Sequence, residues 1–191
     1  EDIFNHASGS NPYRYPNFDM YSSEYLKKAY NRSEAIAEIS GGSEKVRYYT
    51  TTGYYRESSL LKVGKTEDNY VSRFFVRGNV DMQLHKFITA QADANVTFYD
   101  SYSANVDWWG QTATLRPHLV TPFIPLSYIE ATDQNSLNAV LNSSYLQDGK
   151  FFFGGTQQHP TNPVADAYAA GDSKFVSRQF QFNTRFDVNL S

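Results

Sequence analysis

The residue types that perform most enzyme chemistry are sparse and scattered in this sequence. The chain has no cysteine, which excludes a disulfide framework, a thiolate metal site and a cysteine nucleophile. Its histidines stand far apart without a partner at metal-ligand spacing, and we expect loop or turn positions for them: His6, His85, His118 and His159. The sequence contains no phosphate-binding loop, dinucleotide fingerprint or serine-hydrolase elbow. We therefore predict a protein that is not an enzyme, with no catalytic residue, no bound metal and no cofactor.

Polar side chains that could line a wet surface recur at every second position in three later segments. They comprise Arg73, Arg77, Asn79, Asp81, Gln91, Asp93, Asn95, Gln181, Asn183 and Arg185. Two of the carboxylates, Asp81 and Asp93, could form an acid–base pair of the kind that hydrolytic enzymes use. On adjacent strands, however, they fit better as members of a polar surface that also contains Arg73 and Arg77. We interpret the whole set as one water-facing row.

A third group of residues could bind a ligand through aromatic stacking. Trp108 and Trp109 are adjacent in the sequence, and Tyr99 and Tyr102 precede them closely. Such rings can form platforms for sugar rings or for the side chains of a peptide. The alternative is that they pack a long loop or lie at a membrane interface, where tryptophan and tyrosine are enriched. On residue types alone we favour this alternative.

The composition excludes several classes of protein. The chain has 191 residues, of which 16% are aromatic and only 19% charged, unlike a disordered, highly charged polypeptide. Its net charge of −3 and pI of about 5.8 give no reason to expect nucleic acid as a partner. No stretch approaches the roughly 18 apolar residues of a transmembrane helix. The chain starts at Glu1 without a signal segment, and we expect a processed chain or a piece of a longer one.

A mean hydropathy of −0.56 is low for a chain with so many aromatic residues, and alternation explains it. Apolar and polar side chains alternate with a period of two residues, which predicts β-strands. The predicted strands are residues 33–40, 45–57, 70–84, 88–98 and 176–190. The connections between them alternate in length, being short at 41–44 and 85–86 and long at 58–69 and 101–174.

These strands are long for a soluble protein. Three of them alternate over about 13 to 15 residues, whereas soluble strands usually have about five or six and a tilted strand crosses a bilayer in about 9 to 11. Since hydrocarbon offers no hydrogen bonds to the backbone, a membrane sheet closes into a barrel with short periplasmic turns and long outer loops. We therefore predict an all-β fold, an antiparallel segment of a transmembrane β-barrel that needs further strands to close. A soluble antiparallel barrel or sandwich with one wet face is the alternative.

Several motifs are similar to a known family. Residues 40–49 (Ser-Gly-Gly-Ser-Glu-Lys-Val-Arg-Tyr-Tyr), followed by Gly-Tyr-Tyr at 53–55, resemble the early barrel hairpin of SusC-like (RagA-like) TonB-dependent outer-membrane transporters. Residues 73–84 look like the next strand of that family, and 84–88 like its short Leu-x-Lys-aromatic turn. Asn-Pro-Val-Ala at 162–165 is similar to its Asn-Pro loop element. The resemblance covers nearly the whole chain in the family's order.

The resemblance implies a layout for the chain. Residues 1–32 would form an extracellular loop, with a possible short helix at 18–30 where apolar residues are spaced at three and four. Residues 33–102 would hold four barrel strands with short periplasmic turns. Residues 103–173 would form one long extracellular loop, in which 136–145 could form a helix, and 174–191 the fifth strand. These are about five strands of a barrel of about 22, without the plug domain, the TonB-contacting segment or most other strands.

The resemblance also implies a function. Such a transporter lies in the outer membrane of a Gram-negative bacterium and imports oligosaccharides or peptides, with energy delivered through TonB. Its expected partners are a SusD-like surface lipoprotein, TonB, the plug domain with the rest of the barrel, and outer-membrane lipid. The polar row would then line the wall and hydrogen-bond the plug and water more than the substrate. The rival functions are a soluble β-barrel that binds a ligand inside it and a passive, porin-like barrel.

Overall fold

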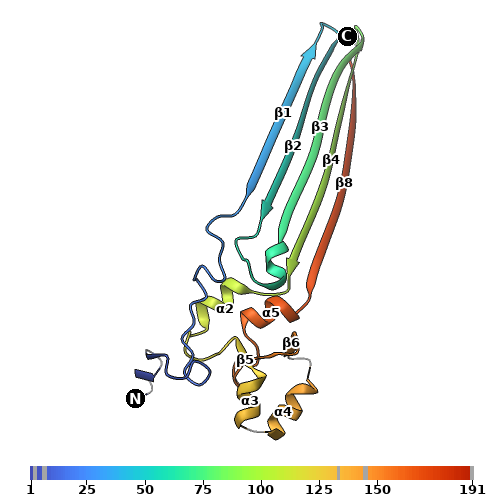
Figure 1. Ribbon diagram of the computed structural model, residues 1–191. Coiled ribbons are helices and arrows are strands. Elements are labelled where there is room, and N and C mark those ends of the chain that lie inside the picture. The colour runs from blue at the N-terminus through green and yellow to red at the C-terminus, as the bar shows by residue number, and fades with distance from the viewer. Residues whose placement is uncertain (2–3, 6–7, 133, 144–145, 190–191) are drawn as a thin grey trace. The chain divides into compact units, whose positions relative to one another are not determined.

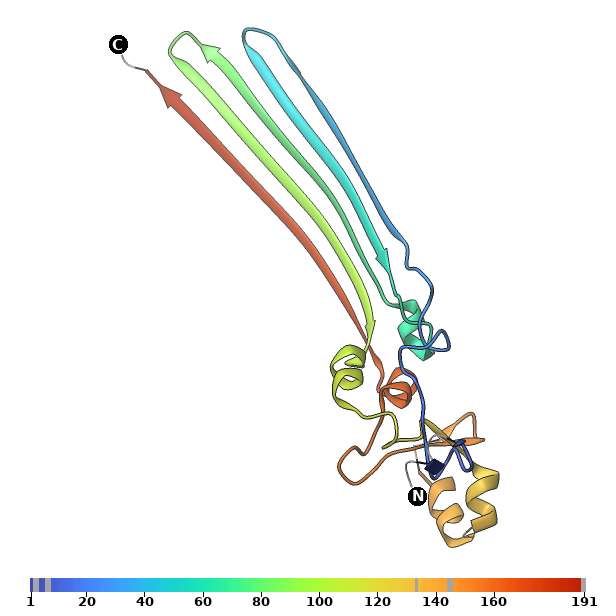
Figure 2. The same ribbon diagram turned by 90° about the vertical axis from the view of Figure 1, so that its left-hand side faces the viewer.

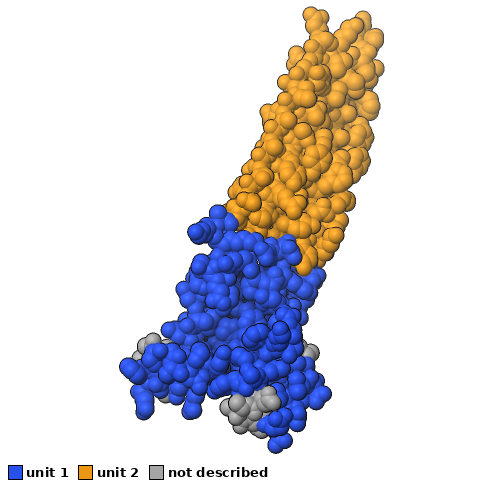
Figure 3. Space-filling view, in the orientation of Figure 1, with its two compact units in different colours: residues 1–29, 60–68, 103–173 blue, residues 30–59, 69–102, 174–191 orange. Residues whose placement is uncertain are grey.

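The chain was analysed as a computed structural model, which describes residues 1, 4–5, 8–132, 134–143 and 146–189. It divides into two compact units, coloured separately in Figure 3. We call the first the loop unit; it comprises Glu1–Ala29, Leu60–Asp68 and Ser103–Ser173. We call the second the sheet unit; it comprises Tyr30–Ser59, Asn69–Tyr102 and Lys174–Ser191.

The sheet unit is built from five long strands in the order β1-β2-β3-β4-β8, each antiparallel to its neighbour (Figure 1). The strands are β1 (Arg32–Gly42), β2 (Val46–Ser58), β3 (Tyr70–His85), β4 (Ile88–Ala104) and β8 (Asp172–Val188). Every segment in which polar and apolar residues alternate is thus a strand, and the predicted antiparallel fold class is confirmed. The strand predicted to end at 190 is described as far as Val188, and Leu190 lies outside the described residues.

The connections at one end of the sheet are tight. Residues 43–45 join β1 to β2, where the Ser43 N–H donates to the Val46 carbonyl at 2.6 Å, and residues 86–87 join β3 to β4. Figure 2 shows both turns at the end of the sheet where β8 finishes. In the register of the sheet, residues on neighbouring strands lie directly opposite one another. Arg77, for example, lies opposite Thr51 on β2 and opposite Asn95 on β4. Residues of one parity on each strand therefore share one face of the sheet.

The loop unit has more regular structure than the sequence predicted for it. Its elements are η1 (Gly64–Asp68), α2 (Trp108–Thr114), β5 (Phe123–Pro125), α3 (Leu126–Thr132), α4 (Gln134–Leu141), β6 (Leu146–Gln147), β7 (Phe151–Phe153) and α5 (Pro163–Ala169). The three short strands form a second sheet in the order β5-β7-β6. Helix α4 occupies most of the predicted helix at 136–145, whose residues 144–145 lie outside the described part. No helix in the described ranges is both long and apolar enough to cross a bilayer.

One core holds the loop unit together. It gathers buried side chains from all three of the unit's segments: Met20, Tyr25, Leu61, Val63, Trp108, Leu115, Val120, Val164 and Ala167. Burying apolar surface contributes roughly 25 cal/mol per Å², so a core shared among segments far apart in sequence makes their folding cooperative. The long connections therefore form a packed body.

The helix predicted at 18–30 is absent, and that prediction was wrong. The segment forms turns, in which the N–H groups of Tyr25 and Leu26 both donate to the Ser22 carbonyl. The chain then forms a β-bridge between Leu26 and Leu61, with the Lys62 N–H donating to the Tyr25 carbonyl at 3.0 Å. A backbone carbonyl that accepts from a distant segment does not continue a helical ladder. The spacing of apolar residues here reflects packing into the core.

Candidate functional site

One face of the sheet unit is polar, and we call it the polar face. It contains Arg73, Arg77, Asn79, Asp81, Gln91, Asp93, Asn95, Gln181, Asn183 and Arg185, on β3, β4 and β8. Register places Asn79 opposite Asp93 and Asp81 opposite Gln91. Every one of these residues was predicted from alternation, and the sheet places all of them on the same face.

Hydrogen bonds connect the polar face across its strands. Asn79 Nδ2 donates to Asp93 Oδ1, and Asn183 Nδ2 donates to the second oxygen of the same carboxylate at 3.4 Å. Asn95 Nδ2 donates to Gln181 Oε1 at 3.3 Å. Asp93 therefore accepts from amides on both neighbouring strands and is not paired with a second carboxylate, as an acid–base dyad would require. The geometry is that of a hydrogen-bonded wall.

The polar face is hollowed into an open concavity of about 1210 Å³. Its lining comes from β3, β4 and β8 and includes both arginines of β3, Phe75, Tyr99 and Phe175. Neither Arg73 nor Arg77 forms an ion pair with a side chain in the described part of the chain. The lining of the concavity therefore presents the two arginines, the Asp93 carboxylate and neutral amides to water or to a partner that fills it.

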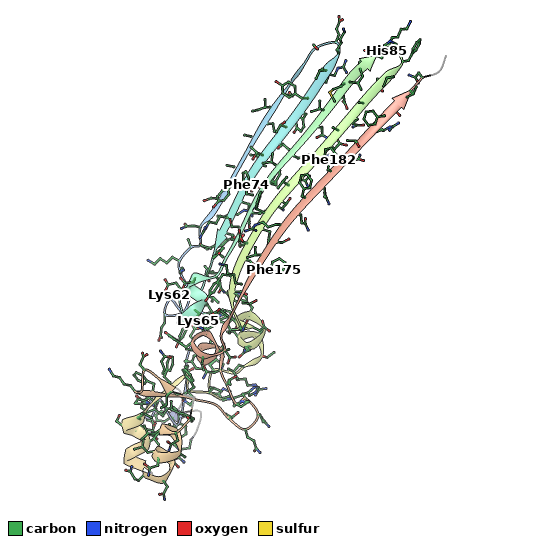
Figure 4. The ribbon with its side chains drawn as sticks, turned by 90° about the vertical axis from the view of Figure 1, so that its right-hand side faces the viewer. Lys62, Lys65, Phe74, His85, Phe175 and Phe182 are labelled. Carbon is green, nitrogen blue, oxygen red and sulfur yellow. The ribbon has the colours of Figure 1, made fainter. Side chains whose placement is uncertain are left out.

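The opposite face of the sheet is apolar and exposed, and we call it the apolar face. Phe180 and Phe182 on β8 are 70% and 63% exposed, and Phe74 and Phe98 pack in a cross-strand pair with ring centroids 6.1 Å apart. Figure 4 labels Phe74 and Phe182 along the strands and His85 at the hairpin end. Water-soluble monomers rarely expose a contiguous apolar surface of this kind. From Phe74 to Leu84 the face also spans the roughly 9 to 11 residues that cross a bilayer.

A charged pair lies on the apolar face toward the long connections, and sequence analysis missed it. The guanidinium of Arg178 donates to both carboxylate oxygens of Asp100, at 2.9 and 3.2 Å, and to the Tyr99 carbonyl at 3.0 Å. It also lies over the Phe98 ring, 5.4 Å from the centroid. The signal was present, since Arg178 interrupts the apolar parity of β8. Pairing satisfies both charges where the apolar face ends.

The four aromatic residues considered for ligand binding are not brought together. Tyr99 and Tyr102 lie on opposite faces of β4, Tyr99 lining the concavity and Tyr102 stacking on Tyr70 with centroids 6.4 Å apart. Trp108 and Trp109 belong to the loop unit. Trp108 is only 2% exposed, which leaves it no free ring face for a ligand, whereas Trp109 is 50% exposed.

The described histidines belong to separate elements of the structure, and His6 is outside the described residues. His85 ends β3 and contacts the Phe87 ring at the hairpin turn, while His118 and His159 lie in connections of the loop unit. Among the described residues, no group of three or more histidine or acidic side chains could hold a metal ion.

The Asn-Pro element forms a buried joint in the loop unit. Asn162 is fully buried; its Oδ1 accepts from the Ala165 N–H at 2.9 Å and caps α5, and its Nδ2 donates to the Gly154 carbonyl at 2.7 Å. Pro163 occupies the first turn, where its missing N–H costs nothing. Tyr25 lies in the same unit's core, and burial, with the nearby charge of Glu24, raises its pKa to about 12.

Comparison with known proteins gives one distant relationship. The chain is 26% identical, over 136 residues, to a TonB-dependent receptor of Formosa agariphila; the match covers 71% of this chain and 12% of that receptor. No protein-family model matches the chain, and no solved structure matches it significantly. The chain thus spans a small part of its relative's length. The chain is therefore similar to part of one TonB-dependent receptor, and its long antiparallel strands form the sheet of a β-barrel segment.

Proposed function

We propose that this chain is one sector of the wall of a TonB-dependent transporter in the outer membrane of a Gram-negative bacterium. The proposal rests on one observation above all: long antiparallel strands present an apolar, exposed face on one side and a hydrogen-bonded polar face on the other. Lipid on one side and a wet lumen on the other require that arrangement. The similarity to a TonB-dependent receptor supports transport over an enzymatic role.

The polar face is the side of the proposed wall that takes part in transport. In the proposed barrel it contacts the plug domain and water, and its amides and arginines exchange partners as the plug is displaced by the pull of TonB. The transporter imports an oligosaccharide or a peptide, and a SusD-like lipoprotein covers the extracellular side. The resemblance of the hairpin motif at 40–55 to SusC-like transporters supports this finer assignment. No covalent chemistry is involved.

Two other functions would require a different arrangement of the faces or a barrel without a plug. A soluble ligand-binding barrel would hide its apolar face inside, around the ligand, and present polar side chains to water. A passive porin shares the wall but has no plug, and the similarity to a receptor disfavours it.

Adjacent residues on β8 give a sharp test of the membrane wall. Phe180 lies on the apolar face, and its neighbour Gln181 lies on the polar face. In the full-length protein, Phe180→Arg puts a charge into lipid and should cost about 2–4 kcal/mol near the bilayer midplane. Gln181→Arg puts the same charge into the lumen and should cost far less. The measurement is the fraction of folded protein in outer membranes; equal tolerance of both variants would refute the wall.

Transport itself is tested with the complete gene in its natural host. Uptake of oligosaccharides and of peptides is measured in wild-type cells, in cells without TonB and in cells that lack the neighbouring surface lipoprotein. The proposal predicts uptake that is lost without TonB and reduced without the lipoprotein. Uptake that continues unchanged without TonB would support the passive pore instead.

A further inference from the structure

Two aromatic contacts join separate segments of the loop unit. Tyr25 packs against Trp108 with ring centroids 5.7 Å apart, and Tyr21 packs against Trp109 with centroids 6.5 Å apart. The inner pair is buried in the core. In the outer pair, Tyr21 is 55% and Trp109 50% exposed. The same two segments therefore meet twice, once in the core and once at the surface.

The inner pair and the local backbone hold the outer pair in place. Trp108 anchors the start of α2, whose N-cap, Asp107, accepts from the Gly110 N–H at 3.1 Å. On the other segment, the Tyr21 N–H donates to Asp19 Oδ1 at 2.8 Å. An aromatic side chain has only two rotatable bonds, so a ring mounted on a fixed backbone loses little entropy when it binds a ligand.

We propose that Tyr21 and Trp109 form a stacking platform for a pyranose ring of a neutral oligosaccharide. The two ring planes are inclined by 32°, and each side chain keeps about half of its surface exposed although the rings are in contact. Carboxylates, which also accept hydrogen bonds from sugar hydroxyls, lie at the backbone of both platform segments: Asp19 Oδ1 accepts from the Tyr21 N–H, and Asp107 Oδ1 accepts from the Gly110 N–H. Those negative charges disfavour an acidic sugar. The platform rests on the proposed function, and it identifies neutral sugar as the substrate class.

The other roles for exposed aromatic residues fit this pair less well. Packing of the loop is already performed by Trp108, which is in the core. Membrane-interface aromatic residues of a barrel lie on the lipid-facing side of its strands, as the stacked pair of Tyr70 and Tyr102 does on the apolar face. Tyr21 lies in a turn and Trp109 in a helix of the loop unit.

Binding to the purified full-length receptor tests the platform. The probes are maltohexaose, cellohexaose, laminarihexaose and xylohexaose as neutral sugars, an oligogalacturonate as an acidic one, and a pentapeptide. Relative to wild type, Trp109→Ala should weaken neutral-sugar binding about tenfold, which corresponds to about 1.4 kcal/mol, because the exposed ring face is lost. Tyr21→Ala should weaken it less, and Trp109→Phe should retain part of the affinity. Leu141→Ala, at an exposed apolar residue of α4, is the matched control and should change nothing.

The outcomes separate the platform from the transport function. Wild-type affinity in Trp109→Ala, or binding of only the acidic sugar or the peptide, overturns the platform. TonB-dependent uptake of peptides alone would leave the transporter in place and remove the sugar assignment. If neither sugars nor peptides enter the cell through TonB, the transport function itself fails.

Discussion

Replacement of Asn162 separates two roles that the same side chain performs in the loop unit. Its oxygen caps α5 by accepting from the Ala165 N–H, and its amide nitrogen donates to the Gly154 carbonyl at 2.7 Å. A longer bond of 3.4 Å reaches the Pro122 carbonyl, which also accepts from the Gly154 N–H. Removal of the side chain therefore deprives the Gly154 carbonyl of its hydrogen-bond donor, at a site where Asn162 itself is fully buried.

The cost of Asn162→Ala follows from these contacts. Loss of a helix cap costs about 1 kcal/mol, and a buried carbonyl without its donor costs about 1–3 kcal/mol. The local stability around α5 should thus fall by about 2–4 kcal/mol. Asn162→Asp keeps the cap but points a carboxylate oxygen at the Gly154 carbonyl, so it should destabilise the unit at least as much as alanine does.

Hydrogen–deuterium exchange of the full-length protein measures this local stability. Exchange at α5 and β7 should accelerate about 30-fold to 1000-fold in Asn162→Ala, which corresponds to the estimated free energy. Asn138→Asp, at an exposed position of α4, provides the matched control and should exchange like wild type. Wild-type exchange in Asn162→Asp would refute the reasoning, because it would mean that only the cap matters.

Three further predictions concern the wall and the core. Gly53→Val should destabilise the folded protein in membranes by about 1–3 kcal/mol, since a Cβ there overlaps the Phe75 ring. Adding Phe75→Ala should restore part of the lost stability. Arg178→Ala should destabilise the protein more than the double variant with Asp100→Ala, because it leaves a carboxylate unpaired on the apolar face. Between pH 10 and 12, thermal stability should fall more steeply in wild type than in Tyr25→Phe.

The sign of each effect follows from a physical contrast. Valine favours strands more than glycine does, so a stabilised Gly53→Val would contradict the close contact with Phe75. A double variant as unstable as Arg178→Ala would show that the unpaired Asp100 carboxylate carries no penalty, contrary to the prediction. For Tyr25, the raised pKa means that the folded state binds more protons than the unfolded state in that window, so stability falls as pH rises. Parallel pH profiles for the two proteins would contradict this.

The two faces of the sheet could be predicted from the sequence, because the side on which a strand residue lies depends only on its position along the strand. A strand exposes alternate residues to opposite sides, so parity alone assigns each side chain of 70–84 to the apolar or the polar face. The same rule would have separated Tyr99 from Tyr102, since three positions along a strand place two side chains on opposite faces. It would also have singled out Arg178 as a charge on the apolar side.

The structure of the loop unit could not be predicted in this way, because it depends on contacts between residues that lie far apart in sequence. Its core joins segments that lie far apart in sequence, and the turns at 18–26 take their conformation from a bridge to Leu61. Adjacent residues on a helix point about 100° apart, so one of Trp108 and Trp109 had to face outward. Only the partners Tyr25 and Tyr21 decide which one does. Which tryptophan stays exposed is therefore determined by contacts with residues more than 80 positions away along the chain, which no motif at the two tryptophans encodes.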